Sequence, residues 1–208
     1  CVRLRQRRLL RDDLDRGLTM TTQLLTWPER LPESLDALYE KAAEQLGAQV
    51  TPLAGLEEVS TRRSGERDVL VAVIDAALVS GQATPAGVVS ALNILAHQPD
   101  LDLVAIVSDG YIGSDATDVG HSLAGAATIS ALRSMAVRKG TTCRANVVCV
   151  PEAMFGIAST QRGPLAHTVD VDDVVAAVTF LLGSSGTYLN GQVLFVDGGR
   201  HLFSSMTA

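Results

Sequence analysis

The residues of this sequence that could perform chemistry are scattered, and two of them stand out. His121 carries an imidazole, a group that titrates near neutral pH and can exchange a proton. Ser108 precedes it by thirteen residues, in a Ser-Asp-Gly segment. Both also have structural interpretations, Ser108 as a cap or turn residue and His121 as a residue of a helix start. Without further partners, we favour the structural interpretation for each.

Other reactive side chains offer no recognisable site. Tyr111 lies in the same segment as Ser108, but no lysine is spaced to assist it. The adjacent carboxylates of Asp172 and Asp173 begin a predicted helix, where capping and the helix dipole explain them. The histidines and cysteines have no metal-ligand spacing: His97, His121, His167, His201, Cys1, Cys143 and Cys149. We therefore predict no metal site.

The elements that must position these residues are buried strands alternating with helices. Apolar runs rich in β-branched residues predict strands over 68–74, 101–107, 145–150 and 192–196, with a shorter strand over 48–53. Helices are predicted over 32–47, 84–97, 120–139 and 170–182, with Thr84 as an N-cap before Pro85. This alternation is typical of βαβ units. It predicts an α/β fold, a Rossmann-like doubly wound parallel sheet, with a shortened N-terminal half.

Composition narrows the class of protein. The 208 residues are 47% hydrophobic and 4% aromatic, which suits a parallel sheet covered by Ala-rich helices. A net charge of −6 without a basic stripe argues against nucleic-acid binding, and no apolar run is long enough to cross a membrane. The odd number of cysteines favours a reducing cytoplasm. We expect residues 1–19 to be a tail or an upstream-encoded extension, with a basic docking helix as the alternative, and residues 20–208 to be one domain.

The C-terminal third carries a family pattern. A helix with Asp172-Asp173-Val174, a Ser-containing turn at 183–185, an Asn190-Gly191-Gln192 step and a strand ending in Asp197-Gly198-Gly199 follow one another. This order resembles the end of classical short-chain dehydrogenases/reductases, above all the 3-oxoacyl-ACP reductase-like and hydroxyacyl dehydrogenase-type members. Four segments in the middle resemble the family's fourth to sixth strands and its catalytic helix: 68–71, 103–108, 131–136 and 144–148. The resemblance covers about 68–199 and is weak before that.

The resemblance implies a nicotinamide cofactor, for which this sequence lacks the usual residues. The first hundred residues contain no GxxxGxG or GxGxxG, the glycine turn that brings backbone amides close to a pyrophosphate. The family's Asn-Asn-Ala-Gly turn falls on the degenerate positions Ala72, Val73, Ile74 and Asp75. We therefore expect that this chain binds no cofactor and that NAD(P) is bound by an active partner subunit.

The family's acid/base residues are also replaced. Its Tyr and Lys, four residues apart on one helix, fall on His121 and Gly125, and its catalytic serine falls on Ser108. A lysine at the second position would lower the pKa of the tyrosine, and glycine cannot do so. The degenerate positions Ser108, His121 and Gly125 are thus the only catalytic candidates that the resemblance implies.

The segments that the sequence keeps are those through which the family assembles, namely the long helices and the last helix and strand. The small residues over 124–127 and the apolar run over 192–196 favour protein contacts, with Ala124, Ala127, Leu132, Val193 and Phe195 as interface candidates. We predict a catalytically impaired pseudoenzyme subunit that pairs, in a hetero-oligomer, with an active ketoreductase-like paralogue. Two alternatives remain: a homo-oligomeric binding protein that uses the old substrate cleft between 108–118 and 152–167, and a divergent reductase that acts alone through His121 and Ser108.

Overall fold

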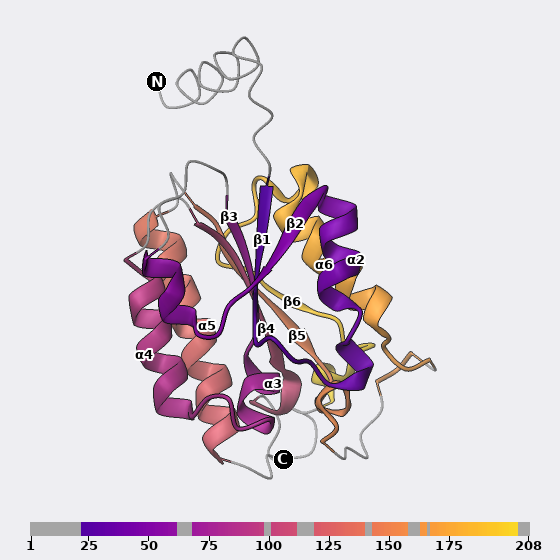
Figure 1. Cartoon of the computed structure of the whole chain (residues 1–208). Coiled ribbons are helices and arrows are strands. Elements are labelled where there is room, and N and C mark those ends of the chain that lie inside the picture. The colour runs from indigo at the N-terminus through magenta and orange to yellow at the C-terminus, as the bar shows by residue number, and fades with distance from the viewer. Residues whose placement is uncertain are drawn as a thin grey trace.

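The computed structural model describes residues 22–61, 68–97, 101–111, 119–139, 143–157, 163–165 and 167–203. They form a parallel sheet of six strands in the order β2-β1-β3-β4-β5-β6, with helices on both faces (Figure 1). The strands are β1 (Thr22–Trp27), β2 (Ala48–Pro52), β3 (Asp68–Val73), β4 (Leu101–Ser108), β5 (Ala145–Val150) and β6 (Val193–Phe195). The predicted Rossmann-like sheet is confirmed.

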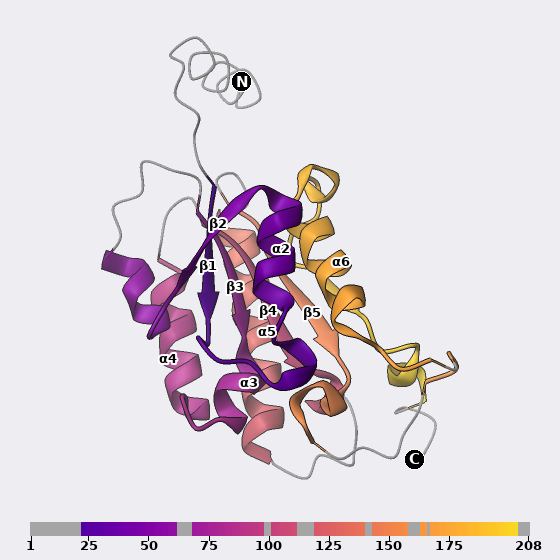
Figure 2. The same ribbon diagram turned by 45° about the vertical axis from the view of Figure 1, so that its right-hand side comes forward.

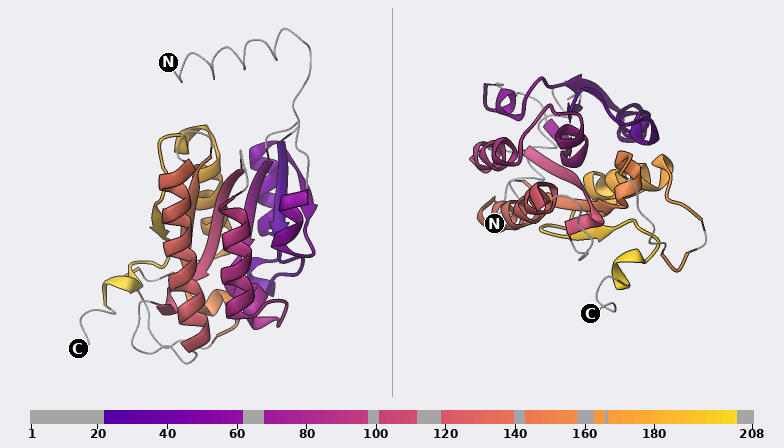
Figure 3. Two further views of the ribbon diagram at one scale, coloured as in Figure 1. Left: turned by 90° about the vertical axis from the view of Figure 1, so that its left-hand side faces the viewer. Right: turned by 90° about the horizontal axis from the view of Figure 1, so that it is seen from below.

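The helices are divided between the two faces of the sheet. They are α2 (Leu38–Leu46), α3 (Ile74–Val79), α4 (Pro85–Leu95), α5 (Val119–Lys139) and α6 (Val171–Leu182). Helices α4 and α5 lie side by side on one face, and α2 and α6 lie together on the other (Figures 2 and 3). Short 3-10 turns follow several strands: η2 (Leu56–Thr61), η3 (Asp109–Tyr111), η4 (Glu152–Phe155) and η6 (Arg200–Leu202).

Each face of the sheet has its own apolar core. Side chains alternate along the strands, so Leu25, Leu70 and Leu103 pack toward α4 and α5, while Leu24, Val71 and Val104 pack toward α2 and α6. All eight residues of β4, the strand at the centre of the sheet, are buried. Burial on both faces explains why the strands read as continuous apolar runs in the sequence.

Predicted helix starts are confirmed at two places. The Thr84 hydroxyl accepts a hydrogen bond from the Gly87 N–H at 3.1 Å, with Pro85 as the first helical residue of α4. At α6, Asp170 and Asp173 form a reciprocal capping box. Asp172 and Asp173 therefore have the structural role that their position predicted.

The N-terminal half departs from the predictions in three ways. Strand β1 was not predicted, and the helix predicted over 32–47 is a 3-10 turn, η1 (Glu33–Leu35), followed by α2. Helix α3 starts directly at the end of β3, where only a strand was expected. Between β2 and β3 the described residues hold only η2, so the shortened half is confirmed. None of the helices in the described ranges combines the length and apolar character that crossing a membrane requires.

Candidate functional site

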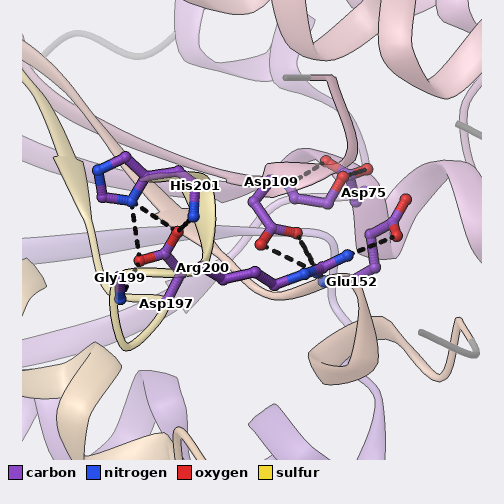
Figure 4. A network of polar contacts seen from close by, with 8 residues as sticks. Asp75, Asp109, Glu152, Asp197, Gly199, Arg200 and His201 are labelled. Atoms are coloured by element: carbon purple, nitrogen blue, oxygen red, sulfur yellow. Dashed lines mark hydrogen bonds and ion pairs between the residues drawn. The ribbon is translucent and has the colours of Figure 1, made fainter. Parts of the chain in front are cut away.

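The carboxyl ends of the parallel strands bring a group of polar side chains together. Ligands of open α/β sheets bind at this edge, outside the carboxyl ends of the strands. Asp75 follows β3, Asp109 follows β4, Glu152 follows β5 and Asp197 follows β6 (Figure 4). Three of them, Asp75, Asp109 and Asp197, are almost fully buried. Such carboxylates need partners, because an isolated buried charge is very unfavourable.

Asp75 binds Ser108 twice. One carboxylate oxygen accepts the Ser108 hydroxyl and the other accepts the Ser108 backbone N–H, each at 2.9 Å. Burial raises the pKa of Asp75, and the two hydrogen bonds from Ser108 oppose that rise. The residue that replaces the family's glycine therefore holds the residue at the catalytic-serine position.

His121 lies close to the same pair. It is half-buried in the first turn of α5, and its charge lowers the pKa of Asp75. The structure thus brings together Ser108 and His121, the two residues that the sequence singled out. The group between them is Asp75, which the sequence analysis treated only as a degenerate position. The single hydroxyl hydrogen of Ser108 is donated to the Asp75 carboxylate, so the hydroxyl is not paired with an imidazole as in an activated Ser–His pair.

Gly125, at the lysine position, is buried against Tyr111. A Cβ atom built on Gly125 would lie 3.3 Å from the Tyr111 Cβ, tighter than an ordinary contact. Burial raises the pKa of Tyr111, and a side-chain hydrogen bond to Cys149 raises it further. A tyrosine that transfers protons near neutral pH needs a lowered pKa. Tyr111 is therefore no substitute for the missing pair.

Arg200 forms an ion-pair network that the sequence analysis missed. Its Nη1 donates to both oxygens of Asp109, at 2.7 and 2.9 Å, and its Nη2 lies 3.6 Å from Glu152 Oε2 (Figure 4). Asp109 also accepts the Glu152 backbone N–H at 3.2 Å. Burial raises the pKa of Asp109 to about 6, although the Arg200 charge opposes the shift. One arginine thus ties the turn after β6 to the ends of β4 and β5.

The same turn contains a second pair. The His201 Nδ1 lies 2.8 Å from an oxygen of Asp197, and the imidazole stacks on Phe195 with 4.2 Å between ring centroids. Asp197 is 1% exposed, so its carboxylate is desolvated and the contact fixes the orientation of the imidazole. The Asp-Gly-Gly resemblance predicted the turn but not the roles of the two residues after it.

Two interface candidates prove to belong to the core. Ala124 and Leu132 are 0% and 1% exposed and pack against the sheet within the chain, so neither can contact a partner. Ala127, Val193 and Phe195 are partly buried. The large apolar side chains that α5 does expose are Val119, Leu123 and Val137. A groove of about 710 Å³ runs beside them, lined by Tyr111, Ala126, Ile129, Ser130, Arg133, Ser134, Val137 and Arg138.

The positions at which the family's cofactor-binding residues are replaced have structural explanations. Ala72, Val73 and Ile74 are fully buried where β3 passes into α3. At the end of β1, Trp27 and Pro28 stand where a glycine turn would be expected, joined by a cis peptide bond. One buried polar atom there is unsatisfied: the Thr26 hydroxyl makes no hydrogen bond within the described ranges. A polar ligand group at this edge of the sheet could satisfy it.

The structure tests the remaining sites only in part. The old substrate cleft includes residues 112–118, 158–162 and 166, which lie outside the described residues, as does the N-terminal segment 1–19. Next to it, a groove of about 460 Å³ lies between the 164–173 segment and the end of β6. In the part of the chain that the structure describes, no group of three or more His, Cys, Asp or Glu side chains could hold a metal ion.

The sequence matches a curated protein of the expected kind. An uncharacterized short-chain type dehydrogenase/reductase (y4vI) from Sinorhizobium fredii is 27% identical over 184 residues, which cover 83% of this chain and 33% of that protein. The chain thus spans about a third of the length of this relative. No family model matches the sequence.

Solved structures share the fold at low identity. A 3-alpha-hydroxysteroid dehydrogenase from Pseudomonas sp. B-0831, complexed with NADH, matches with a TM-score of 0.62 and 19% identity, over 90% of this chain and all of that one. A small-chain dehydrogenase in complex with NADPH matches with a TM-score of 0.62 and 16% identity, over 88% of this chain and 99% of that one.

These two structures contradict the expectation that this chain binds no cofactor. Both neighbours hold a nicotinamide nucleotide in the fold that this chain shares. The expectation rested on a single glycine-free turn, whereas the carboxyl ends of several strands together make a nucleotide site in such folds. The missing glycines are therefore no sufficient ground for excluding a nucleotide.

Proposed function

We propose that this chain, whose sequence match and fold support its place in the short-chain dehydrogenase/reductase family, is a catalytically impaired subunit that works with an active NAD(P)-dependent member. The observation that carries the proposal is the environment of Gly125. The backbone of α5 at this position packs against Tyr111, so the lysine position is filled by a neighbouring side chain. His121 and Ser108 remain nearby, but both are grouped around the buried carboxylate of Asp75.

A nicotinamide nucleotide belongs to this proposal. The similar structures that contain NADH and NADPH support binding at the carboxyl edge of the sheet, and the unsatisfied Thr26 hydroxyl offers a hydrogen bond there. When bound, the nucleotide would supply the hydride chemistry. This chain's own residues would hold the nucleotide and orient it. Because they lack the Tyr–Lys pair for proton transfer, turnover would take place in the active partner's own site.

The partner surface that we propose is the outer face of α5. Val119, Leu123 and Val137 are 80%, 62% and 86% exposed and are apolar, an arrangement typical of a protein contact. The groove beside them could take side chains of a second helix. The relative is about three times as long as the matched segment, which also supports a second unit, because the part of that protein beyond the match has room for one.

Activity measurements on the purified chain, alone and mixed with reductases encoded beside it, test the proposal. We expect no turnover of NADH or NADPH with carbonyl substrates by the chain alone, and a faster or more stable partner enzyme in the mixture. Turnover by the chain alone that disappears in Ser108→Ala or His121→Ala would favour the divergent reductase instead. A chain that stays monomeric with every reductase tested would contradict the pairing.

The α5 surface is tested by charge substitution. Leu123→Glu with Val137→Glu should abolish the complex in light-scattering measurements, because two carboxylates would be buried without partners. Val79→Glu is a matched control, since Val79 is an exposed apolar residue at the end of α3. If the control weakens the complex as much as the α5 pair does, this surface assignment is wrong.

The groove beside β6 favours a second candidate function, ligand binding by a homo-oligomer. Its walls are largely apolar, from Pro164, Leu165, Val169, Phe195 and Val196, which suits an acyl or polycyclic ligand. A fluorescent fatty acid that binds the wild-type chain and not the Val169→Asp variant would support this function. Binding that is unaffected by the substitution would count against it.

A further inference from the structure

The turn after β6 is held to the candidate site by one buried arginine. The Arg200 side chain is 11% exposed and that of its main partner, Asp109, is 3% exposed. Figure 4 shows Arg200 reaching from the turn across to Asp109 and Glu152. Because both charges have lost most of their water, each depends on the other for its stability. To leave the sheet, the C-terminal turn must therefore break this contact, together with the hydrogen bond from the Leu165 N–H to the Gly198 carbonyl and the stacking of His201 on Phe195.

The turn itself is built to present Arg200 in one direction. The Asp197 carboxylate accepts hydrogen bonds from the backbone N–H groups of Gly199 and His201, at 2.9 and 2.8 Å, and contacts the His201 ring. Gly198 and Gly199 have φ values of 63° and 83°, a region that other residues enter at a cost. These contacts lie within the turn, so they would persist if the turn moved as a unit.

The space in front of β4 and β5 is filled by the chain's own side chains. The Glu152 carboxylate lies directly over Gly110, so close that any Cβ at this position would overlap Glu152 Oε1. Arg200 lies beside it, against Asp109. Ser108, the last residue of β4, directly precedes Asp109. A ligand that approached the end of β4 would meet Glu152 and Arg200 first.

Arg200 is hydrogen-bonded to Asp109 but only loosely paired with Glu152. Arg200 Nη1 makes two short hydrogen bonds to Asp109, whereas the 3.6 Å separation between Nη2 and Glu152 is too long for one. The buried Nε of Arg200 has no hydrogen-bond partner within the described part of the chain. A buried donor without a partner is unfavourable. The closed arrangement therefore leaves one N–H of this arginine unsatisfied, at a cost in free energy.

We propose that the C-terminal turn, residues 197–203, is a latch that Arg200 closes over the carboxyl ends of β4 and β5, and whose release opens the candidate site to a ligand. The latch deepens the proposed function and rests on it in one respect, that the ligand admitted is the nicotinamide nucleotide. The turn moves as a unit, with Asp197 and His201 holding its internal shape while Arg200 leaves Asp109.

Hydrogen–deuterium exchange on the full chain tests the latch. In Arg200→Gln, we expect the peptides that contain Glu152 and residues 200–203 to exchange about tenfold faster or more, because their contacts to Asp109 and the turn are released. Asp109→Asn should have the same effect, and the double variant should add nothing further. Glu44→Gln is the control, since it removes an exposed charge from α2, far from the turn in sequence and outside both proposed sites. Unchanged exchange in Arg200→Gln would overturn the proposal.

A variant with a smaller change keeps the test valid if Arg200→Gln fails to fold. Glu152→Gln removes only the charge at 3.6 Å and should accelerate exchange in the same two peptides to a smaller extent. If Arg200→Gln unfolds, local acceleration in Glu152→Gln still supports the latch. If both variants accelerate exchange throughout the sheet, β4 included, Arg200 is a general support of the fold and the latch is wrong.

A nucleotide titration separates the latch from the proposed function. The sole tryptophan, Trp27, lies at the carboxyl end of β1, and its fluorescence reports binding there. We expect Arg200→Gln to bind NADH about tenfold more tightly than wild type, with Glu44→Gln unchanged. Faster exchange without nucleotide binding by any variant would support the latch and contradict the nucleotide part of the proposed function. Tighter binding without faster exchange would contradict the latch alone.

Discussion

The carboxylate of Asp75 accepts both hydrogen bonds that Ser108 can donate, one from its hydroxyl and one from its backbone N–H, each at 2.9 Å. This pair joins the end of β3 to the end of β4. It also explains how a charged residue survives at a position where the related family has glycine. Asp75 is 1% exposed, and its two hydrogen bonds to Ser108 replace water that it has lost.

We predict that Asp75→Ala destabilises the chain strongly. The substitution leaves a buried N–H and a buried hydroxyl without acceptors, which costs about 2–4 kcal/mol of unfolding free energy in total. Ser108→Ala removes one hydrogen bond and should cost about 1 kcal/mol. Urea denaturation of both variants and the double variant measures the coupling between them. Additive effects would show that the two side chains do not stabilise one another.

The second prediction concerns pH. The folded-state pKa of Asp109, about 6, lies above its ordinary value of 3.8 because of burial. The folded state therefore binds this proton more tightly than the unfolded state, so the stability from this group is fully present below about pH 4 and is lost as pH rises through about 6.

The measurement is the unfolding free energy of wild type minus that of Asp109→Asn, taken from about pH 4 to pH 7. This difference should decrease as pH rises, since asparagine does not titrate. The raised pKa of Asp75 acts in the same direction in both proteins and cancels in the subtraction. A difference that grows with pH would mean that the attraction between Asp109 and Arg200 outweighs the burial.

The third prediction compares a buried ion pair with an exposed one. Arg144 donates to Asp102 at 2.8 Å, and it also donates to the carbonyl of Leu182 at the end of α6 and to that of Gly186 beyond it. The two side chains are 12% and 8% exposed. Arg144→Met should therefore cost about 3–5 kcal/mol, because it removes one member of a buried ion pair.

Lys41 and Asp172 provide the control for this pair. Their contact is as short, 2.6 Å, but the side chains are 40% and 69% exposed. Lys41→Met should cost far less than Arg144→Met, since water screens the exposed charges. Equal losses in the two variants, measured by urea denaturation, would contradict the role of burial.

The fourth prediction concerns Gly110. Gly110→Ala would force the Glu152 side chain away, since the new Cβ overlaps its carboxylate. The end of a flexible side chain moves easily, so we expect a loss of about 1 kcal/mol and a weaker contact with Arg200. Glu152→Ala should remove the overlap, so the double variant should be no less stable than Glu152→Ala alone. If Gly110→Ala costs the same in both backgrounds, Glu152 is not the obstacle.

The sequence predicted the parts of the fold that depend on local patterns. The run 69–73 and all of β4 are buried on both faces, which gives continuous apolar runs that cannot be mistaken for surface strands. Thr84 and Pro85 indicated a helix start, because an N-cap and a proline at the first helical position act within one helical turn. Strand β1 was missed because Pro28 and Pro32 follow it closely and made the segment look like a loop.

The site was predictable only where the family pattern pointed to it. Ser108 and His121 were found by resemblance, and the structure brings both to Asp75. Arg200 and Glu152 were missed because their contacts join segments far apart in the chain, and no short pattern records which charge will meet which. Ala124 and Leu132 were misassigned because small and apolar residues suit a buried helix face and a contact surface equally well.

The shortened N-terminal half also sets where the sheet stops. In the described structure the sheet ends at β2, whose outer backbone groups face away from β1. This strand has the composition of a protected boundary: Gln49 and Val50 are exposed, and Pro52 removes a donor at its end. With β2 at its edge, the sheet thus ends in a strand that resists being extended by a neighbouring polypeptide.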